Sequence, residues 1–153
     1  MGDLNMKKLS EAYKELGIVF TFPIEVRNAH GKETYYENSK GYWRKSEYDA
    51  QGNRTYYENS DDFWSKCEYD AEGNEIYFED SNGFWRKKEY DDEGTRTYYE
   101  NSEGYWWKSE YGAQGNRTYY EDSTGIKQGT PQSQSCDGKV IEIDGKKYKL
   151  KEL

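Results

Sequence analysis

The chain is poor in the residues that most catalytic and metal sites need. Its 153 residues include one histidine, two cysteines and two prolines. His30 falls at a turn position, and no Ser-His-Asp or Cys-His pair can be placed around it. Cys67 and Cys136 lack a C-x-x-C spacing and are too few for a disulfide framework, so we expect two thiols in a reducing compartment. The sequence therefore predicts no catalytic residue, no metal site and no cofactor, and we expect that the protein is not an enzyme.

Long hydrophobic runs are also missing. No stretch approaches the roughly 18 consecutive apolar residues of a membrane span, and residues 1–17 lack the apolar core of a signal peptide. We therefore expect a protein of the cytoplasm, in a bacterial host cell, with no membrane partner. The net charge of −8 argues against binding to nucleic acid or to an anionic membrane.

Aliphatic residues are scarce, and aromatic residues take their place. Hydrophobic residues make up 33% of the chain, charged residues 34% and aromatic residues 18%, including 17 tyrosines. Disordered chains are poor in aromatics. We therefore expect a folded protein in which tyrosine and tryptophan rings supply most of the apolar contact.

A unit of 21 residues recurs through the middle of the chain and reads [YF]-W-x-K-x-E-Y-D-x-x-G-N-x-T-Y-Y-E-N-S-x-G. A degenerate copy lies upstream, with Phe22 in place of the tryptophan. A period of this size indicates a serial supersecondary unit. The fixed positions include Trp43, Trp64, Trp85 and Trp106; Tyr48, Tyr69, Tyr90 and Tyr111; and Gly31, Gly52, Gly73, Gly94 and Gly115.

Each unit contains two short runs of β-favouring residues, such as 42–48 and 53–58. The runs are separated by D-x-x-G and N-S-x-G segments, which are typical of turns that close on a glycine with positive φ. The sequence therefore predicts a mainly β fold: an elongated antiparallel β-meander of tandem hairpins, with ten strands in five units and no helix between residues 31 and 125.

The odd period also constrains the register. Because side chains alternate between faces, equivalent residues stay on one face only if one turn closes an odd loop and the other an even loop. We expect Asp49 to pair with Asn53 and Lys45 with Tyr57, and Trp64 to lie near Tyr57. One face would then carry Trp43, Lys45, Glu47, Thr55 and Tyr57, and the other would carry Arg44, Ser46, Tyr48, Arg54, Tyr56 and Glu58.

The ends of the chain differ from the repeats. Leu4, Leu9, Ala12, Tyr13 and Leu16 have helical spacing, with Asp3 as a cap and Gly17 as a stop. We divide the chain into an N-terminal cap at 1–30 (the helix plus the degenerate unit), repeats at 31–125, a polar linker at 126–138 and a C-terminal β-hairpin at 139–153. We expect the cap to cover the open edge of the sheet. In the hairpin, Asp144-Gly145 should turn and Glu142 should face Lys147.

The unit resembles YD repeats, as in Rhs-type shell proteins. The resemblance is carried by E-Y-D-x-x-G-N at 47–53 and 68–74 and, with Thr95 in place of Asn, at 89–95. It implies a β-repeat array, which those proteins use as a closed shell around a toxin. The doublets Tyr56-Tyr57 and Tyr77-Phe78 also look like the aromatic repeats of clostridial toxin and choline-binding wall modules, which bind glycans or choline. The ending GKVIEIDGKKYKLKEL is similar to small bacteriophage proteins and implies a mobile-element setting.

These observations favour a protein-interaction module encoded by a phage or mobile element. We expect it to bind a host protein through an acidic β-repeat surface, for example as an inhibitor of a bacterial defence system such as an anti-CRISPR or nucleic-acid mimic. A glycan- or choline-binding module is the alternative, and the protein is expected to be a monomer or an end-to-end dimer. Trp107 replaces Arg44 of the first unit and is the leading contact residue. The predicted binding residues are Trp107, Arg44, Arg86, Tyr48, Tyr56, Tyr90, Tyr98, Glu58 and Glu100.

The same aromatics also have a purely structural interpretation, as a substitute for the missing aliphatic core. Recurrent aspartates such as Asp49, Asp70 and Asp91 are explained by turn formation, so no calcium array is predicted. Glu47 and its equivalents alternate with lysines, which predicts an ion-pair ladder rather than catalytic acids.

Overall fold

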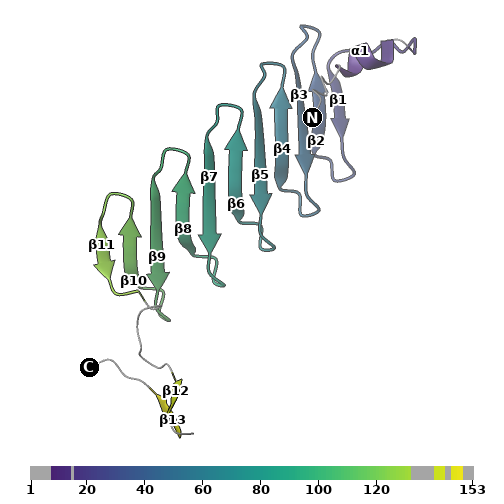
Figure 1. Ribbon diagram of the computed structural model, residues 1–153. Coiled ribbons are helices and arrows are strands. Elements are labelled where there is room, and N and C mark those ends of the chain that lie inside the picture. The colour runs from purple at the N-terminus through teal and green to yellow at the C-terminus, as the bar shows by residue number, and fades with distance from the viewer. Residues whose placement is uncertain (1–7, 15, 132–139, 144–145, 150–153) are drawn as a thin grey trace. The chain divides into compact units, whose positions relative to one another are not determined.

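The computed structural model describes residues 8–14, 16–131, 140–143 and 146–149. The chain divides into two compact units, Met1–Trp85 and Arg86–Leu153, which are described separately. Eleven antiparallel strands form one open sheet in which β1 to β11 follow one another in chain order (Figure 1), and β12 and β13 form a separate hairpin. This topology confirms the predicted meander, and residues 31–125, all of them described, contain no helix.

The strands are short and evenly spaced along the chain. In the first unit, α1 spans Leu9–Lys14 and is followed by β1 (Ile24–Arg27), β2 (Glu33–Glu37), β3 (Trp43–Tyr48), β4 (Arg54–Asn59), β5 (Trp64–Tyr69) and β6 (Glu75–Asp80). The division between units falls at the start of β7 (Trp85–Tyr90). The second unit continues with β8 (Arg96–Asn101), β9 (Trp106–Tyr111), β10 (Arg117–Asp122), β11 (Lys127–Gly129), β12 (Val140–Ile143) and β13 (Lys146–Lys149).

The two turn motifs fold in the same way. In the D-x-x-G turn, Asp49 N–H donates to Asn53 O at 3.0 Å and Gly52 N–H donates to Asp49 O at 3.1 Å. The N-S-x-G turn shows the same two bonds, from Asn59 to Phe63 and, in the preceding copy, from Gly41 to Asn38. The side-chain oxygen at the first turn position accepts further backbone N–H groups, for example from Asn53 to Asp49 at 2.8 Å. The Asp49–Asn53 pairing is confirmed, but the expected even loop is wrong.

A β-bulge resets the parity instead. The register between β3 and β4 shifts between Glu47 and Tyr48, so Tyr48 pairs with Arg54 while Glu47 pairs with Tyr56, and Thr55 is the extra residue. Lys45 therefore pairs with Glu58 rather than with Tyr57. The prediction failed because it counted only loop lengths, whereas a bulge also adds one residue to one strand.

The bulge redistributes the side chains between the two faces. The face that we call the tryptophan face carries Trp43, Lys45, Glu47, Tyr56 and Glu58 in the first full repeat. The opposite face, the arginine face, carries Arg44, Ser46, Tyr48, Arg54 and Tyr57. The prediction had these faces reversed: Tyr56 and Glu58 lie on the tryptophan face, and Tyr57 lies on the arginine face. Trp64 lies opposite Glu58 rather than near Tyr57.

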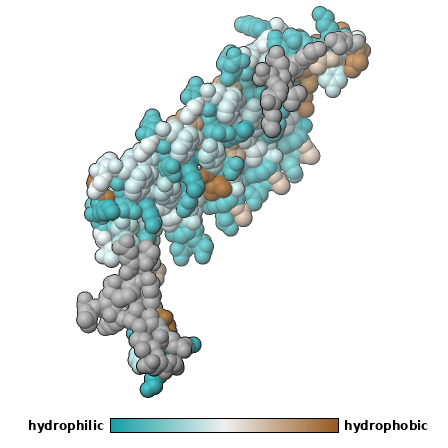
Figure 2. All heavy atoms as spheres, viewed as in Figure 1, coloured by the Kyte–Doolittle hydropathy of each residue, from teal (hydrophilic) through white to brown (hydrophobic). Residues whose placement is uncertain are grey.

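Both faces are only partly buried. Among the residues that the structure describes, Ile24, Tyr35 and Tyr119 are the buried hydrophobic ones, and several buried residues are polar, including Glu37 and Ser109. Figure 2 shows a surface on which hydrophilic and near-neutral residues predominate and apolar residues are few. Aromatic side chains supply contacts within the sheet, for example Tyr57 against Phe63 at 6.1 Å between ring centroids.

The helix α1 lies against the tryptophan face of β2 rather than along the edge strand β1. Leu9 and Ser10 donate hydrogen bonds to the side chains of Tyr35 and Glu37 on β2. Gly17, with φ of 74°, follows the helix as predicted, whereas Asp3 lies outside the described residues. Leu9 also lines a cavity with Val26 of β1, and the expectation that the cap covers the open edge of the sheet stays a prediction.

The C-terminal part adds one strand to the prediction. β11 lies inside the segment expected to be a linker, because the turn that begins at Asp122 closes like the others, with Asp122 N–H donating to Ile126 O at 3.1 Å. In the β12–β13 hairpin, Glu142 pairs with Lys147 as expected, and Asp144-Gly145 lies outside the described residues. Among the described helices, none has the length and apolar content to cross a membrane.

Candidate functional site

A tyrosine and a glutamate two residues apart recur on the tryptophan face. In the first unit, the tyrosine hydroxyl donates to the glutamate carboxylate at 2.9 Å on β2, 3.0 Å on β4 and 3.2 Å on β6. In the second unit the same bond is 2.8 Å long on β8. Residues two apart on a strand point to the same face, so the Y-x-E spacing alone brings the two groups together. The pairs are Tyr35–Glu37, Tyr56–Glu58, Tyr77–Glu79, Tyr98–Glu100 and Tyr119–Glu121.

Burial and the pairing with glutamate both raise the pKa of the tyrosines. Burial and the hydrogen bond to the neighbouring glutamate raise the pKa of Tyr56 and of Tyr98 to about 12. For Tyr119 the hydrogen bond to Glu121 is the larger cause and burial the second, and the pKa again rises to about 12. Each pair therefore presents a carboxylate that is oriented by a neutral hydroxyl and can accept hydrogen bonds from a second donor.

Lysines and further glutamates surround the pairs. Lys45 lies 2.6 Å from Glu47, and Lys87 lies 3.2 Å from Glu89, both within one strand. A full repeat places one lysine and two glutamates on the tryptophan face, as in Lys45, Glu47 and Glu58, which gives a net charge of −1 per repeat. The predicted lysine–glutamate ion pairs are confirmed at Lys45–Glu47, Lys87–Glu89 and Lys108–Glu110.

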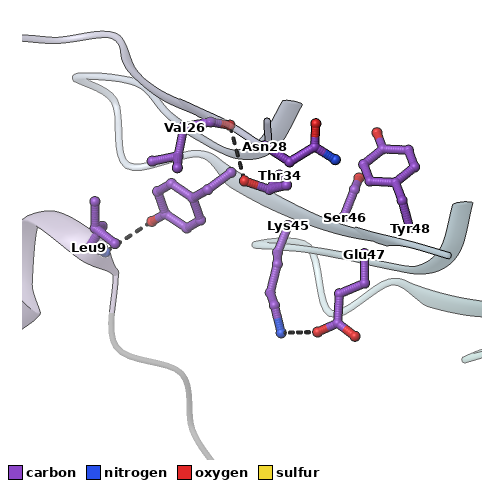
Figure 3. A pocket seen from close by; sticks show the side chains of 9 residues that line it. Leu9, Val26, Asn28, Thr34, Lys45, Ser46, Glu47 and Tyr48 are labelled. Atoms are coloured by element: carbon purple, nitrogen blue, oxygen red, sulfur yellow. Dashed lines mark hydrogen bonds and ion pairs between the residues drawn. The ribbon is translucent and has the colours of Figure 1, made fainter. Parts of the chain in front are cut away.

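The first Tyr–Glu pair is occupied by the chain itself. Leu9 N–H donates to the Tyr35 hydroxyl at 3.0 Å, and Ser10 N–H donates to Glu37 Oε2 at 3.1 Å. The Ser10 hydroxyl donates to Glu37 Oε1, and Glu37 is left only 1% exposed. A cavity of about 470 Å³ adjoins this contact, and Figure 3 shows Leu9, Val26 and the Lys45–Glu47 ion pair among its lining.

The arginine face carries five of the nine predicted binding residues. In the first unit, Arg44 forms a bidentate pair with Glu33 at 2.7 and 3.0 Å, and the Tyr48 hydroxyl donates to the Glu33 carbonyl at 3.1 Å. Beside Glu33, the pKa of Arg44 lies above its ordinary value because of this hydrogen bond. Arg44 and Tyr48 therefore belong to one internal network in the structure.

In the second unit, Arg86, Tyr90 and Trp107 lie on the arginine face. Trp107 stacks on Tyr99, with ring centroids 6.4 Å apart and an interplanar angle of 14°. The Arg96 guanidinium lies 4.9 Å from the Trp107 ring centroid, so the predicted contact residue is the centre of an aromatic and cationic cluster.

The other four predicted residues, Tyr56, Glu58, Tyr98 and Glu100, form two of the Tyr–Glu pairs on the tryptophan face. The nine residues therefore do not share one face. The prediction missed Tyr35, Glu37 and Ser10, although the Y-x-E spacing of the degenerate copy was visible in the sequence. Within the described residues, no group of three or more His, Cys, Asp or Glu side chains is placed to hold a metal ion.

No protein-family model matches the chain, and no curated protein matches it. Among solved structures, it is similar to a crystal structure of TcdB2-TccC3-TEV, at 17% identity and a TM-score of 0.47. It is also similar to a Tc holotoxin pore of Photorhabdus luminescens with a mutated TccC3, at 16% identity and a TM-score of 0.48. Each likeness covers 65% of this chain and 5% of the other. The strands of the open antiparallel meander are joined by turns that include the Y-D-x-x-G pattern, and this arrangement fits a YD-like repeat.

Proposed function

We propose that the chain is a repeat-based, non-enzymatic interaction module that binds another protein through the tryptophan face. The observation that carries this proposal is the recurrence of half-buried Tyr–Glu pairs on a face with a net charge of −1 per repeat. A regular row of oriented acceptors suits a partner that offers several hydrogen-bond donors at a matching interval.

The charge of this face indicates the class of partner. A partner with a basic surface complements it, and complementary charge raises the association rate and selects against acidic proteins. We propose a host protein that itself binds nucleic acid, such as a component of a bacterial defence system, because carboxylates at a regular interval offer it an acidic surface in place of phosphates. The phage or mobile-element origin rests on the C-terminal resemblance and belongs to the same proposal.

The aromatic rings favour a protein partner over choline. Choline recognition uses open aromatic faces that receive the ammonium group. Here cations of the chain already lie over several rings: Lys45 is 5.6 Å from the Tyr56 centroid, and Lys66 is 5.6 Å from the Trp64 centroid. A choline ligand would have to displace these internal cations.

The test is affinity capture of host proteins from bacterial lysates by the full chain. We expect a basic partner that is retained at low salt, released at high salt and lost with the double variant Glu58→Gln/Glu100→Gln. The matched control, Glu72→Gln/Glu93→Gln, removes the same number of carboxylates from two exposed turns, leaves the Lys45–Glu47 and Lys87–Glu89 ion pairs in place, and should retain most of the binding. Recovery of no partner from several hosts, or equal recovery by the double variant, would count against the proposal.

A further inference from the structure

The occupied first copy shows how a Tyr–Glu pair holds a polypeptide. The segment Leu9–Ser10 supplies three donors: two consecutive backbone N–H groups and the Ser10 hydroxyl. These N–H groups belong to the first turn of α1, where a helix leaves its donors without intrahelical partners. The carboxylate of Glu37 and the hydroxyl of Tyr35 satisfy those donors, and a negative charge is favourable at this end of a helix.

The same acceptor geometry recurs in Tyr56–Glu58 and Tyr98–Glu100, where, within the described part of the chain, the paired tyrosine is the donor to each carboxylate. The hydroxyl-to-carboxylate distance is 3.0 Å in Tyr56–Glu58 and 2.8 Å in Tyr98–Glu100, compared with 2.9 Å in the occupied pair. All four of these residues are intermediate in exposure, whereas Tyr35 and Glu37 are buried under α1. In the first unit, the β2 and β4 pairs are two strands apart, or about 10 Å by the usual strand spacing.

The residues beside each pair show why α1 prefers the first copy. Ile24 and Val26 lie beside Tyr35–Glu37, and the positions 21 residues later are Lys45 and Glu47. The apolar neighbours suit Leu9, which lines the same cavity as Val26. A ligand of the later copies must therefore be polar where α1 is apolar, but it meets the same acceptors.

Two of the later copies are better placed to receive a ligand than the others. Lys66 lies 3.4 Å from Glu79, and Lys127 lies 3.3 Å from Glu121, so a cation already shares these two carboxylates. Glu58 and Glu100 are oriented by their tyrosines, and the lysines paired with them in the register, Lys45 and Lys87, form ion pairs with Glu47 and Glu89.

We propose that Tyr56–Glu58 and Tyr98–Glu100 each bind the first turn of a helix of the partner protein, with a serine or threonine supplying the hydroxyl that Ser10 supplies to Glu37. The inference rests on the proposed function and names the structural element that the tryptophan face recognises. The partner turn offers two consecutive N–H groups and one hydroxyl, in the arrangement of Leu9 and Ser10.

The test uses NMR spectra of the full ¹⁵N-labelled chain and an unlabelled peptide that copies residues 8–14 with glutamine in place of Leu9, because the later copies have Lys45 and Glu47 where the first has Ile24 and Val26. We expect shifts of the backbone amides around Tyr56, Glu58, Tyr98 and Glu100 that saturate with peptide concentration. A peptide in which alanine replaces the serine has the same charge and should bind about tenfold more weakly or worse, because it loses a hydrogen bond to a carboxylate. In the chain, Glu58→Gln/Glu100→Gln should weaken binding by a similar factor, and the control Glu72→Gln/Glu93→Gln, which removes two exposed turn carboxylates, should not.

Three results would overturn the inference: no saturable shift, equal binding of the serine and alanine peptides, or equal binding by the double variant. Self-association of the chain through these same residues would also overturn it, because the ligand would then be a second copy. Failure here remains distinct from failure of the proposed function. A captured host partner that is lost with the double variant, together with an inert peptide, rejects only the helix-turn inference. A binding peptide with no captured partner rejects only the proposed function.

Discussion

Replacing Glu37 removes the carboxylate on which α1 rests. This side chain is 1% exposed and accepts three hydrogen bonds, from Ser10 N–H, the Ser10 hydroxyl and the Tyr35 hydroxyl. A helix of six residues is too short to be stable by itself, so the order of α1 depends on this contact. Glu37→Gln and Glu37→Ala therefore probe the docking of α1 with little effect on the strands.

The magnitude follows from what each variant leaves in place. In Glu37→Gln, the amide oxygen can still accept from Ser10 N–H, and the Ser10 hydroxyl can rotate to accept from the new NH₂ group. The loss is then the difference between charged and neutral hydrogen bonds, less the relief of burying a charge, or about 1–2 kcal/mol. Glu37→Ala leaves the donors without any acceptor and should cost about 3 kcal/mol or more.

Amide hydrogen exchange measures this local stability directly. Because about 1.4 kcal/mol corresponds to a factor of ten, Glu37→Gln should speed exchange at Ser10 by about 5- to 30-fold, and Glu37→Ala by about a hundredfold or more. Glu58→Gln is the control, since it changes an equivalent pair that α1 does not touch. If exchange at Leu9 and Ser10 is the same in the wild type and in Glu37→Ala, the Tyr35–Glu37 pair does not hold α1. The first copy would then give no support to the proposal that later Tyr–Glu pairs bind a helix turn.

Three further predictions concern the sheet. Trp107→Ala should destabilise the second unit by about 1–2 kcal/mol, because it removes the stack on Tyr99 and the contact with Arg96. Trp107→Arg restores the arginine found at this position in other repeats and should cost less. Urea unfolding compares the two variants, and a larger loss of stability for the arginine variant would contradict the contribution of the stack. The paired tyrosines Tyr56 and Tyr98 have a pKa raised from 10.0 to about 12, so they ionise more readily in the unfolded chain. Their contribution to the stability of the fold should be complete below pH 10 and lost as the pH rises to about 12. Tyrosinate absorbance and circular dichroism should change together, and full ionisation of the tyrosines with an intact sheet would refute this. Deleting residues 1–17 should cause the protein to associate, because it uncovers the face of β2. Deleting residues 63–83 removes one repeat and should cause less association. Light scattering on both variants shows which of them associates more.

The repeated part of the fold was predictable because each repeat contains its own signals. The D-x-x-G and N-S-x-G segments marked the turns, and the Asp49–Asn53 pair followed from turn chemistry alone. The register beyond the turn was not predictable in the same way. The bulge residue Thr55 looks like any other strand residue, and its effect appears only in the pairing of β3 with β4. That single residue decides which face carries Tyr56 and which carries Tyr57.

The candidate site was predictable in part for a related reason. Tyr56, Glu58, Tyr98 and Glu100 were predicted as binding residues, and the structure joins them into two hydrogen-bonded pairs. Their separation from Arg44, Tyr48 and Trp107 follows from the bulge. The contact of Ser10 with Glu37 joins residues 27 positions apart, across the boundary between helix and repeat, so no periodicity could reveal it.

The degenerate first copy differs from the four full copies beside the Tyr–Glu pair, and this difference shows what the pair and its neighbours each contribute. Four copies place a lysine and a glutamate beside the Tyr–Glu pair, and the degenerate copy places Ile24 and Val26 there. The degenerate copy keeps the tyrosine and glutamate acceptors and changes only the residues beside them. It therefore separates the contribution of the Tyr–Glu pair from that of the flanking residues, which identical repeats would not do. The Tyr–Glu pair provides hydrogen bonds for a polypeptide turn, and the flanking residues decide which turn is accepted. Under the proposal above, one sheet holds its own helix on the first copy and offers the later copies to a partner of different polarity.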